Sequence, residues 1–187
     1  MKLAVHFCCG PCAVYPLEQW EKQGHEIVGY WYNPNIHPYT EYIKRLDSLM
    51  KLSNLKDLNV NYNDSYDLDL FLSEVAGAPT EPERCIKCYA LRLRQTARYA
   101  ANEGCDAFTT TLTLSPYQKH EVIKEIGKKM GDENHIEFVY QDYRQGYRGG
   151  YNRARDMGLY MQQYCGCIYS ERDRFMEMNR EKIIKKF

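Results

Sequence analysis

Three thiols within five residues constrain this chain more than any other feature. They stand in the segment Cys8-Cys9-Gly10-Pro11-Cys12, directly after an apolar run. Four further cysteines form two close pairs, Cys85 with Cys88 and Cys165 with Cys167, and the eighth, Cys105, is isolated after Gly104. Single cysteines are ordinary small buried residues, whereas clustered ones usually bind metal or exchange electrons. The clustered thiols are therefore candidates for chemistry, and Cys105 is predicted to be structural.

The length and composition of the chain predict one cytoplasmic domain. At 187 residues the chain can bury a core without cross-links, so residues 1–187 are predicted to form a single metalloenzyme domain. No apolar segment is long enough for a signal peptide or a membrane helix, which predicts a cytoplasmic protein. Disulfides are rare in that reducing compartment, so the clustered thiols are expected to be free, metal-bound or catalytic.

Strand and helix patterns alternate along the chain. Strands are predicted at residues 2–7, 26–32, 60–62, 107–113 and 136–140. Helices are predicted at residues 13–23, from just after Pro38 to about residue 58, at 67–75, from Cys85 to the stop at Gly104, from Ser115 to about Gly131, and on both sides of residues 165–167. Ser115 is predicted to be an N-cap with Gln118 completing a capping box, and residues 142–155 are predicted to be a loop.

This alternation predicts an α/β fold: a mostly parallel, doubly wound sheet flanked by helices, like that of nucleotide hydrolases. Such sheets bind ligands at the C-terminal ends of their strands. The first thiol segment follows the first strand, so a metal site is predicted there, with the other two thiol pairs converging on it. A nucleotide-binding protein would carry a glycine-rich phosphate loop at this position, but the segment contains a single glycine, Gly10.

Spacing alone leaves three chemistries open for the thiols. Four thiolates from Cys8, Cys9, Cys85 and Cys88 suit either a tetrahedral zinc ion or a four-iron cluster. The adjacent Cys8 and Cys9 are awkward around one small ion and easier to place around a larger cluster. The pair Cys9 and Cys12 also has the C-x-x-C spacing of a redox dithiol at a helix N-terminus. The sequence thus predicts an iron–sulfur enzyme, an RNA-binding module with structural zinc, or a thiol–disulfide oxidoreductase.

Two basic segments lie close to the thiols in sequence. Residues 142–155 interleave tyrosine and arginine, which suits stacking on unpaired bases and pairing with phosphates, although a solvated loop would have a similar composition. Residues 84–98 carry five Lys or Arg and no acid. Residues 141–187 contain ten Lys or Arg against six Asp or Glu, in a chain of zero formal net charge. This distribution favours a polyanionic partner such as a single-stranded RNA loop.

Five motifs combine into a specific pattern. They are Cys8-Cys9-Gly10-Pro11-Cys12, Asn33-Pro34-Asn35-Ile36-His37-Pro38, Arg84-Cys85-Ile86-Lys87-Cys88-Tyr89, Phe108-Thr109-Thr110-Thr111-Leu112-Thr113-Leu114-Ser115-Pro116-Tyr117-Gln118 and Tyr164-Cys165-Gly166-Cys167. Together they resemble the QueH family of epoxyqueuosine reductases over nearly the whole chain. The resemblance implies that the epoxide of epoxyqueuosine in a tRNA anticodon loop is reduced to the alkene of queuosine, consuming two electrons and two protons and releasing water. It also implies an iron–sulfur cluster and no cobalamin.

The same resemblance implies roles for individual residues. Cys8, Cys9, Cys85 and Cys88 would hold a [4Fe-4S] cluster, and Cys165 with Cys167 would be a catalytic, redox-active pair. Cys12 would complete a second, mononuclear iron site with Cys165 or Cys167, unless those two close a disulfide. The substrate would be the tRNA anticodon stem-loop, and the reductant a protein such as a ferredoxin or flavodoxin. Candidate proton donors are Asp142, Tyr143, His37 and Tyr117, whereas His6 is expected to be a core residue of the first strand.

Overall fold

The computed structural model describes the backbone of residues 1–184 and the side chains of residues 1–180. Its five strands form one parallel sheet in the order β3-β2-β1-β4-β5. They are β1 (Lys2–His6), β2 (Glu26–Trp31), β3 (Val60–Tyr62), β4 (Ala107–Thr110) and β5 (Glu137–Phe138). Each lies within a segment for which the sequence predicted a strand, although β4 and β5 are shorter than expected. The predicted α/β fold with a parallel sheet is confirmed.

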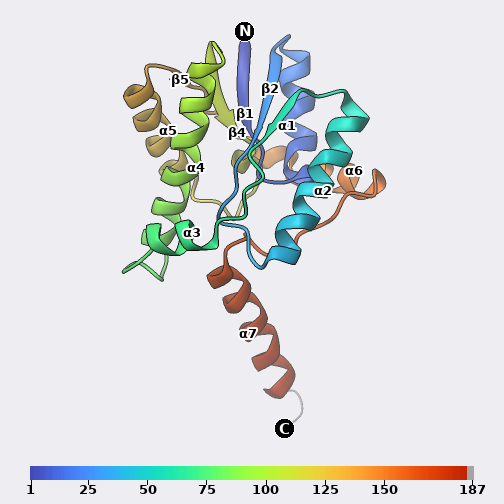
Figure 1. The fold of residues 1–187 in the computed structure, drawn as a ribbon. Coiled ribbons are helices and arrows are strands. Elements are labelled where there is room, and N and C mark those ends of the chain that lie inside the picture. The colour runs from blue at the N-terminus through green and yellow to red at the C-terminus, as the bar shows by residue number, and fades with distance from the viewer. Residues whose placement is uncertain (185–187) are drawn as a thin grey trace.

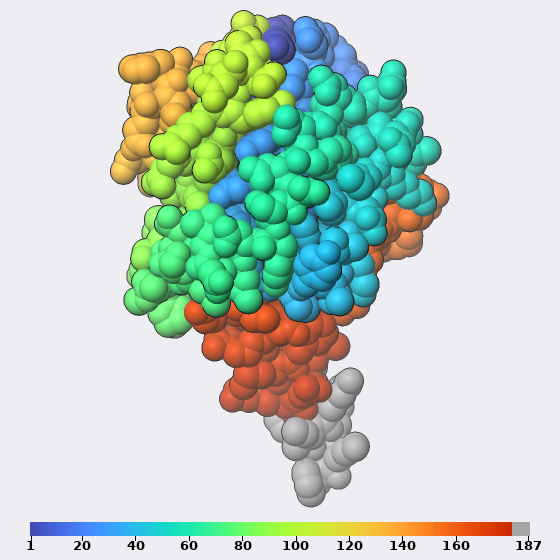
Figure 2. Space-filling model, viewed as in Figure 1, coloured from blue at the N-terminus to red at the C-terminus, as the bar shows by residue number. Residues whose placement is uncertain are grey.

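Helices cover both faces of the sheet (Figure 1). One face carries α1 (Gly10–Lys22), α2 (Tyr39–Lys56) and α6 (Tyr147–Asp156), and the other carries α4 (Glu83–Asn102) and α5 (His120–Asn134), with α3 (Leu68–Glu74) packed on α4. The last helix, α7 (Ile168–Ile184), extends away from this body at the end opposite the N-terminus (Figures 1 and 2). None of the described helices is long and apolar enough to cross a membrane.

The middle of the central strand β1 is apolar, since helices cover both faces of the sheet. Residues 3–5 and Phe7 are fully buried, as is usual for a central strand of a parallel sheet. The large aromatic side chains of Trp20, Trp31 and Phe108 fill the core on either side of it. His6 is also fully buried; its ring nitrogens contact the Thr110 hydroxyl at 2.9 Å and the Tyr32 carbonyl oxygen at 3.2 Å. Burial lowers the pKa of His6 to about 4, so its ring is neutral.

The segment 142–155 is helical from Arg144 onward, and the predicted loop is wrong. A short 3-10 turn, η2 (Arg144–Gly146), leads directly into α6. Gly146 and Gly150 face α1, where a Cβ atom on Gly146 would overlap ring atoms of Tyr15 and one on Gly150 would lie 2.9 Å from the Tyr15 Cβ. The two glycines are therefore sites of close packing between α6 and α1, and this packing stabilises a helix that its composition disfavours.

The segment after β4 also differs from the prediction. Residues 111–113 belong to a 3-10 helix, η1 (Thr111–Leu114), which begins where the Thr110 hydroxyl accepts a hydrogen bond from the Leu112 amide at 3.2 Å. Ser115 ends η1, and its hydroxyl accepts from the Tyr117 amide at 3.3 Å within a tight turn. Helix α5 starts only at His120. The predicted N-cap role of Ser115 is wrong because its side chain is used in this turn.

The strand order reverses at β1. The chain passes from β1 through α1 to β2 on one side, and β4 pairs with β1 on the other side. In open parallel sheets a crevice forms at such a reversal, outside the C-terminal ends of the strands. The thiol segment after β1 occupies this position.

Candidate active site

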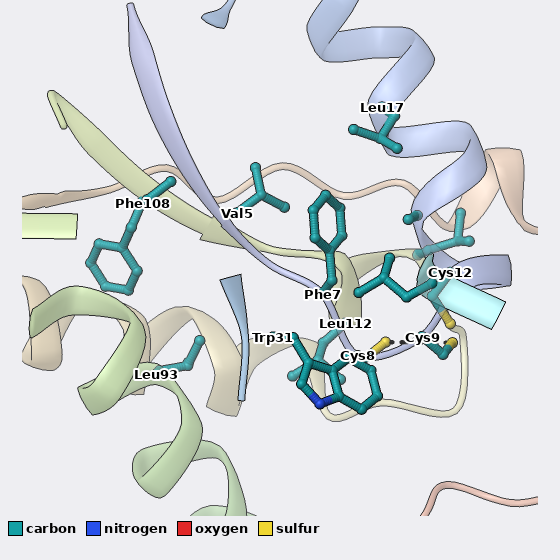
Figure 3. Packing of buried hydrophobic residues seen from close by; sticks show 14 of the residues in the cluster. Val5, Phe7, Cys8, Cys9, Cys12, Leu17, Trp31, Leu93, Phe108 and Leu112 are labelled. Carbon is teal, nitrogen blue, oxygen red and sulfur yellow. Dashed lines mark hydrogen bonds between the residues drawn. The ribbon is translucent and has the colours of Figure 1, made fainter. Parts of the chain in front are cut away.

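The three thiols of the first segment come together after β1, at the point where the strand order of the sheet reverses. The sulfurs of Cys8, Cys9 and Cys12 all lie within 4.8 Å of one another, and those of Cys8 and Cys9 are 3.9 Å apart. All three side chains are buried at the edge of the core, beyond Phe7 (Figure 3). Cys9 occupies the N-cap position of α1 and Cys12 lies in its first turn. The positive end of the helix dipole therefore favours negative charge on this group.

One thiol of this triad ionises first. Hydrogen bonds from Cys12 and Cys9, and a further one of 3.3 Å from the Thr111 hydroxyl, hold the pKa of Cys8 well below its usual range. Burial raises the pKa of Cys9, and its thiol donates toward Cys8. Within the triad, these contacts favour negative charge on Cys8 over negative charge on Cys9. A bound cation would allow the remaining thiols to ionise.

Two residues that the sequence did not single out complete this side of the site. The side-chain amide of Gln162 donates to Cys9 Sγ at 3.1 Å and to Cys12 Sγ at 3.4 Å, and lies 2.8 Å from the Tyr151 hydroxyl. The Tyr151 hydroxyl is itself 3.8 Å from Cys12 Sγ. Burial raises the pKa of Tyr151 far above its usual value, so its hydroxyl remains a proton donor. Both residues stand about 140–150 positions away from the thiols that they contact, which explains why spacing could not reveal them.

The other two thiol pairs form a second group. Cys85 and Cys88 lie in the first turns of α4, where burial raises their pKa values to about 11 and about 12. Charge on Cys165 raises both values further, which places Cys165 near both thiols. Cys88 and Cys167 also belong to one small apolar cluster. Among the described residues, only Cys8, Cys9 and Cys12 have metal-binding atoms that all approach within 4.8 Å.

Arg45 holds the loop that carries Cys165. Its guanidinium is buried; Nη2 donates to the Tyr164 carbonyl oxygen and Nη1 to the Cys165 carbonyl oxygen, each at 2.9 Å. Its Nε donates to the Glu41 carboxylate at 2.7 Å, completing a buried ion pair. Gly166 has φ +141°, and a Cβ there would lie 3.1 Å from Arg45 Nη1. Only glycine therefore suits this position, both in backbone conformation and in space.

A cavity of about 560 Å³ opens in front of the thiols. Its wall includes one thiol from the second group, Cys165, and two from the triad, Cys8 and Cys12. Four tyrosines also line it: Tyr117, Tyr147, Tyr151 and Tyr164. Two cations, Arg45 and Arg174, complete the polar part of the wall. The volume and the mixture of aromatic and polar groups are typical of a site for a small organic group.

The four candidate proton donors differ in exposure and in position relative to the cavity. Tyr117 lies on the cavity wall and is 82% exposed. His37 and Tyr143 are buried and do not line the cavity. Asp142 forms an ion pair with Arg144, which lowers the pKa of its carboxyl to about 2. Of the four, only Tyr117 faces the cavity, and Tyr151 is a candidate that the sequence did not suggest.

The predicted basic surface is less continuous than its sequence indicated. Arg84 and Arg92 are buried, so residues 84–98 do not present five cations to solvent. Arg153 pairs with Glu18 at 2.8 Å, whereas Arg148 is exposed. Part of the predicted C-terminal positive charge, at Lys182, Lys185 and Lys186, lies outside the described side chains.

Three comparisons with known proteins agree with this architecture. Residues 3–173 match the family model described as "Epoxyqueuosine reductase QueH". The epoxyqueuosine reductase QueH of Dehalococcoides mccartyi is 38% identical over 178 residues, covering 95% of this chain and 97% of that protein. The corresponding Haemophilus influenzae protein is 33% identical, covering 97% of this chain and 78% of its own length.

A solved structure shares the fold at low sequence identity. It is the U34-tRNA thiolase NcsA from Methanococcus maripaludis with its [4Fe-4S] cluster, with a TM-score of 0.55, 19% identity, and coverage of 97% of this chain and 67% of that one. This likeness concerns the fold. The family model and the full-length relatives decide the assignment: the chain belongs to the QueH family of epoxyqueuosine reductases.

Proposed function

We propose that this chain reduces the epoxide of epoxyqueuosine in tRNA within the 560 Å³ cavity, with electrons from an iron–sulfur cluster held by its thiols. One observation carries the proposal: Cys8, Cys12 and Cys165, which come from two separate thiol groups, face the same cavity at the point where the strand order of the sheet reverses. Family membership supports the reaction. It supports neither an RNA-binding module with structural zinc nor a general thiol–disulfide oxidoreductase.

The residues present suit an iron–sulfur cluster. Both thiol groups offer only sulfur donors, and both lie at helix N-termini, which favour thiolates. We assign the [4Fe-4S] ligands to Cys8, Cys9, Cys85 and Cys88, which leaves Cys12 for a second iron with Cys165 or Cys167. The [4Fe-4S] cluster of the thiolase that shares this fold supports the same cofactor here. When bound, such a cluster supplies electrons one at a time.

The tyrosines of the cavity suit an unpaired base. Tyr117 stands exposed at the mouth, its ring 6.1 Å from that of Tyr147, which is in turn 4.4 Å from the Tyr151 ring. Stacking of a base on such a ring contributes about 1–3 kcal/mol. A flipped anticodon nucleotide would stack at the mouth and direct its cyclopentane ring inward. Exposed arginines of α6 and α7, Arg148 and Arg174, would contact the flanking phosphates.

Tyr151 is our candidate for donating a hydrogen bond to the epoxide oxygen. The reaction consumes two electrons and two protons, breaks both C–O bonds of the epoxide and releases the oxygen as water. A hydroxyl whose pKa is raised by burial stays protonated and donates a hydrogen bond to the oxygen as negative charge develops on it. Tyr151 lines the cavity and lies beside the triad, so it can reach an epoxide that faces the thiols.

The direct test is anaerobic reconstitution followed by two measurements. Iron and acid-labile sulfide are quantified per chain, and the protein is then supplied with a reductant and an anticodon stem-loop carrying epoxyqueuosine, with the product identified by mass spectrometry. The proposal requires a brown protein that forms queuosine. A colourless protein containing zinc, or a brown one that leaves the epoxide intact, would refute the cofactor or the reaction respectively. The Cys105→Ser variant is the matched control, because Cys105 precedes β4 at the N-terminal edge of the sheet, whereas the triad follows the C-terminal end of β1.

A further inference from the structure

Arg92 is a buried cation without an acidic partner. It lies on α4, and only 2% of the residue is exposed. Its Nε donates to the Cys88 carbonyl oxygen at 3.2 Å, and its Nη2 has no hydrogen-bond partner. No ion pair within residues 1–180 includes Arg92. A buried charge left in this state is strongly destabilising, so some other negative charge is expected to balance it.

Other cationic side chains near the thiols form ion pairs with acidic side chains. Arg45 pairs with Glu41, and both Arg84 and Lys119 pair with Glu81. Arg92 is the buried exception. It cannot serve as a phosphate contact for RNA, because it neither reaches solvent nor lines the cavity.

The groups around Arg92 indicate which negative charge compensates its positive charge. Burial lowers the pKa of Arg92, and negative charge on Cys88, Cys165, Tyr89 and Cys8 raises it above the usual value. Three of these four groups are thiols, and they come from both thiol groups of the site. His6, the other titratable side chain close by, is neutral and its pKa is lowered further by Arg92, so it offers no compensation. The guanidinium lies one helical turn beyond Cys88, with its Nε on the Cys88 carbonyl oxygen and its Nη2 buried without a partner.

We infer that Arg92 is the fixed counter-charge of an anionic iron–sulfur centre, placed behind the thiolates to hold that centre and to raise its reduction potential. The inference rests on the proposed cofactor, and it adds Arg92 to the residues that set the reduction potential of that cofactor. A positive charge fixed in a medium of low dielectric favours the more negative, reduced state of a nearby cluster. Arg92 is accordingly a positioning and tuning residue, because it does not reach the cavity in which the substrate binds.

The test compares Arg92→Met, Arg92→Lys and Arg98→Met with wild type. Met keeps an unbranched apolar stem and removes the charge, Lys keeps the charge, and exposed Arg98 lies on the same helix, so Arg98→Met is the matched control. Midpoint potentials are measured by redox titration followed by electron paramagnetic resonance, and cluster loss by the decay of visible absorption after addition of a chelator. Thermal unfolding of each apoprotein is recorded in parallel.

We expect Arg92→Met to shift the potential to more negative values and to lose its cluster about tenfold faster or more, with Arg92→Lys between it and wild type. Arg98→Met should match wild type. The Arg92→Met apoprotein should be at least as stable as the wild-type apoprotein, because an apolar side chain replaces an uncompensated buried charge.

Two results would overturn the inference. The first is an unchanged potential and an unchanged rate of cluster loss in Arg92→Met. The second is an Arg92→Met apoprotein that is destabilised or unfolded, which would make Arg92 a support of the fold irrespective of any cluster. Failure of the proposed cofactor is a different outcome, since the wild-type protein would then itself carry no cluster to titrate.

Discussion

The side-chain amide of Gln162 lies 3.1 Å from the sulfur of Cys9 and donates a hydrogen bond to it. Gln162 belongs to the segment between α6 and α7, whereas Cys9 caps α1. The contact therefore ties the wall of the cavity to the segment that carries the thiol triad. Hydrogen bonds to cluster sulfurs and thiolates raise reduction potentials and stabilise the bound state.

We expect Gln162→Glu to weaken iron binding, because it replaces a donor with a negative charge beside the thiolates. Iron and sulfide per chain after reconstitution should fall well below wild type. The neighbouring change Gln163→Glu is the matched control: Gln163 lines the same cavity but forms no hydrogen bond to a thiol among the described residues. Equal iron content in the two variants would show that the contact has no influence on the metal.

The proposed ligand set predicts that Cys8→Ala, Cys9→Ala, Cys85→Ala and Cys88→Ala each bleach the visible spectrum. Removing one of four thiolates leaves an iron with an open coordination position, and such a cluster is lost in the presence of chelator. Iron and sulfide analysis measures the effect. Full content in all four variants would contradict the assignment, and loss in Cys12→Ala with retention in Cys85→Ala would move the centre onto the triad.

Substitutions of Cys165 and Cys167 are expected to affect activity and not the cluster. Cys165→Ser and Cys167→Ser should abolish epoxide reduction while leaving the fold and most of the cluster absorption intact. Conversion of epoxyqueuosine in tRNA, measured beside the visible spectrum of the same sample, distinguishes the two effects. A near wild-type rate in either variant would remove that residue from the mechanism, and loss of the cluster would instead place it among the ligands.

Binding of the anticodon loop should depend more on Arg148 than on Arg144 or Arg153. Arg144 and Arg153 already pair with Asp142 and Glu18, whereas Arg148 is exposed and has no ion pair within residues 1–180. Arg148→Gln should weaken binding and lower the slope of log affinity against log salt by about 0.7–0.9 for each phosphate that the arginine neutralises. The exposed Lys128 on α5 provides the control, Lys128→Gln. Identical salt slopes for the two variants would argue against docking on this surface.

The stability of the apoprotein should fall in acid because of His37. Its ring is buried between Tyr66 and Phe71, neither ring nitrogen has a partner, and burial lowers its pKa to about 4 from 6.5. Between these two values the unfolded chain binds a proton that the folded chain excludes, so stability decreases as the pH falls from about 6.5 to about 4. The contribution lost by pH 4.5 is on the order of 2–3 kcal/mol.

Urea unfolding at pH 7 and pH 4.5 measures this loss. His37→Phe should show a smaller decrease in the free energy of unfolding between the two pH values. Phenylalanine cannot bind the proton that His37 takes up in the unfolded chain. The same decrease in both proteins would assign the acid sensitivity to other groups, of which His6 is the first candidate.

The sheet and the position of the thiols were predictable because both depend on local pattern. Residues 3–5 form an unbroken apolar run, and the cysteines of the first motif follow it without an intervening element, so their place at a strand end required only the alternation of strands and helices. Helix α6 was not predictable in this way. Its glycines disfavour a helix when taken alone, and the proximity of Tyr15, more than 130 residues earlier, explains Gly146 and Gly150.

Other features that the sequence did not predict also depend on contacts between distant parts of the chain. Arg92 has the sequence surroundings of a surface cation because its neighbours along α4 include other cations, yet the helix turns it into the core. Gln162 carries no signal in its own surroundings, and Tyr151 was expected only as one tyrosine of the 142–155 segment. Their contacts with thiols at the other end of the chain come from the tertiary structure. Long-range contacts of this kind are set by tertiary packing, which periodicity and spacing do not encode.

The hydrogen bonds of Arg45 to the 164–165 carbonyls have a consequence for how this site can change. The Tyr164 side chain helps to hold the loop, because its hydroxyl donates to the His37 carbonyl oxygen at 2.6 Å. At position 165 the path of the loop depends on the main-chain oxygens that the guanidinium binds, and not on the side chain. Substitutions there can alter the chemistry of the cavity wall while its shape is retained. Related enzymes with other substrates could therefore evolve from this scaffold, or be engineered on it, by exchanging the side chain at position 165 while keeping Arg45, Glu41, Tyr164 and Gly166.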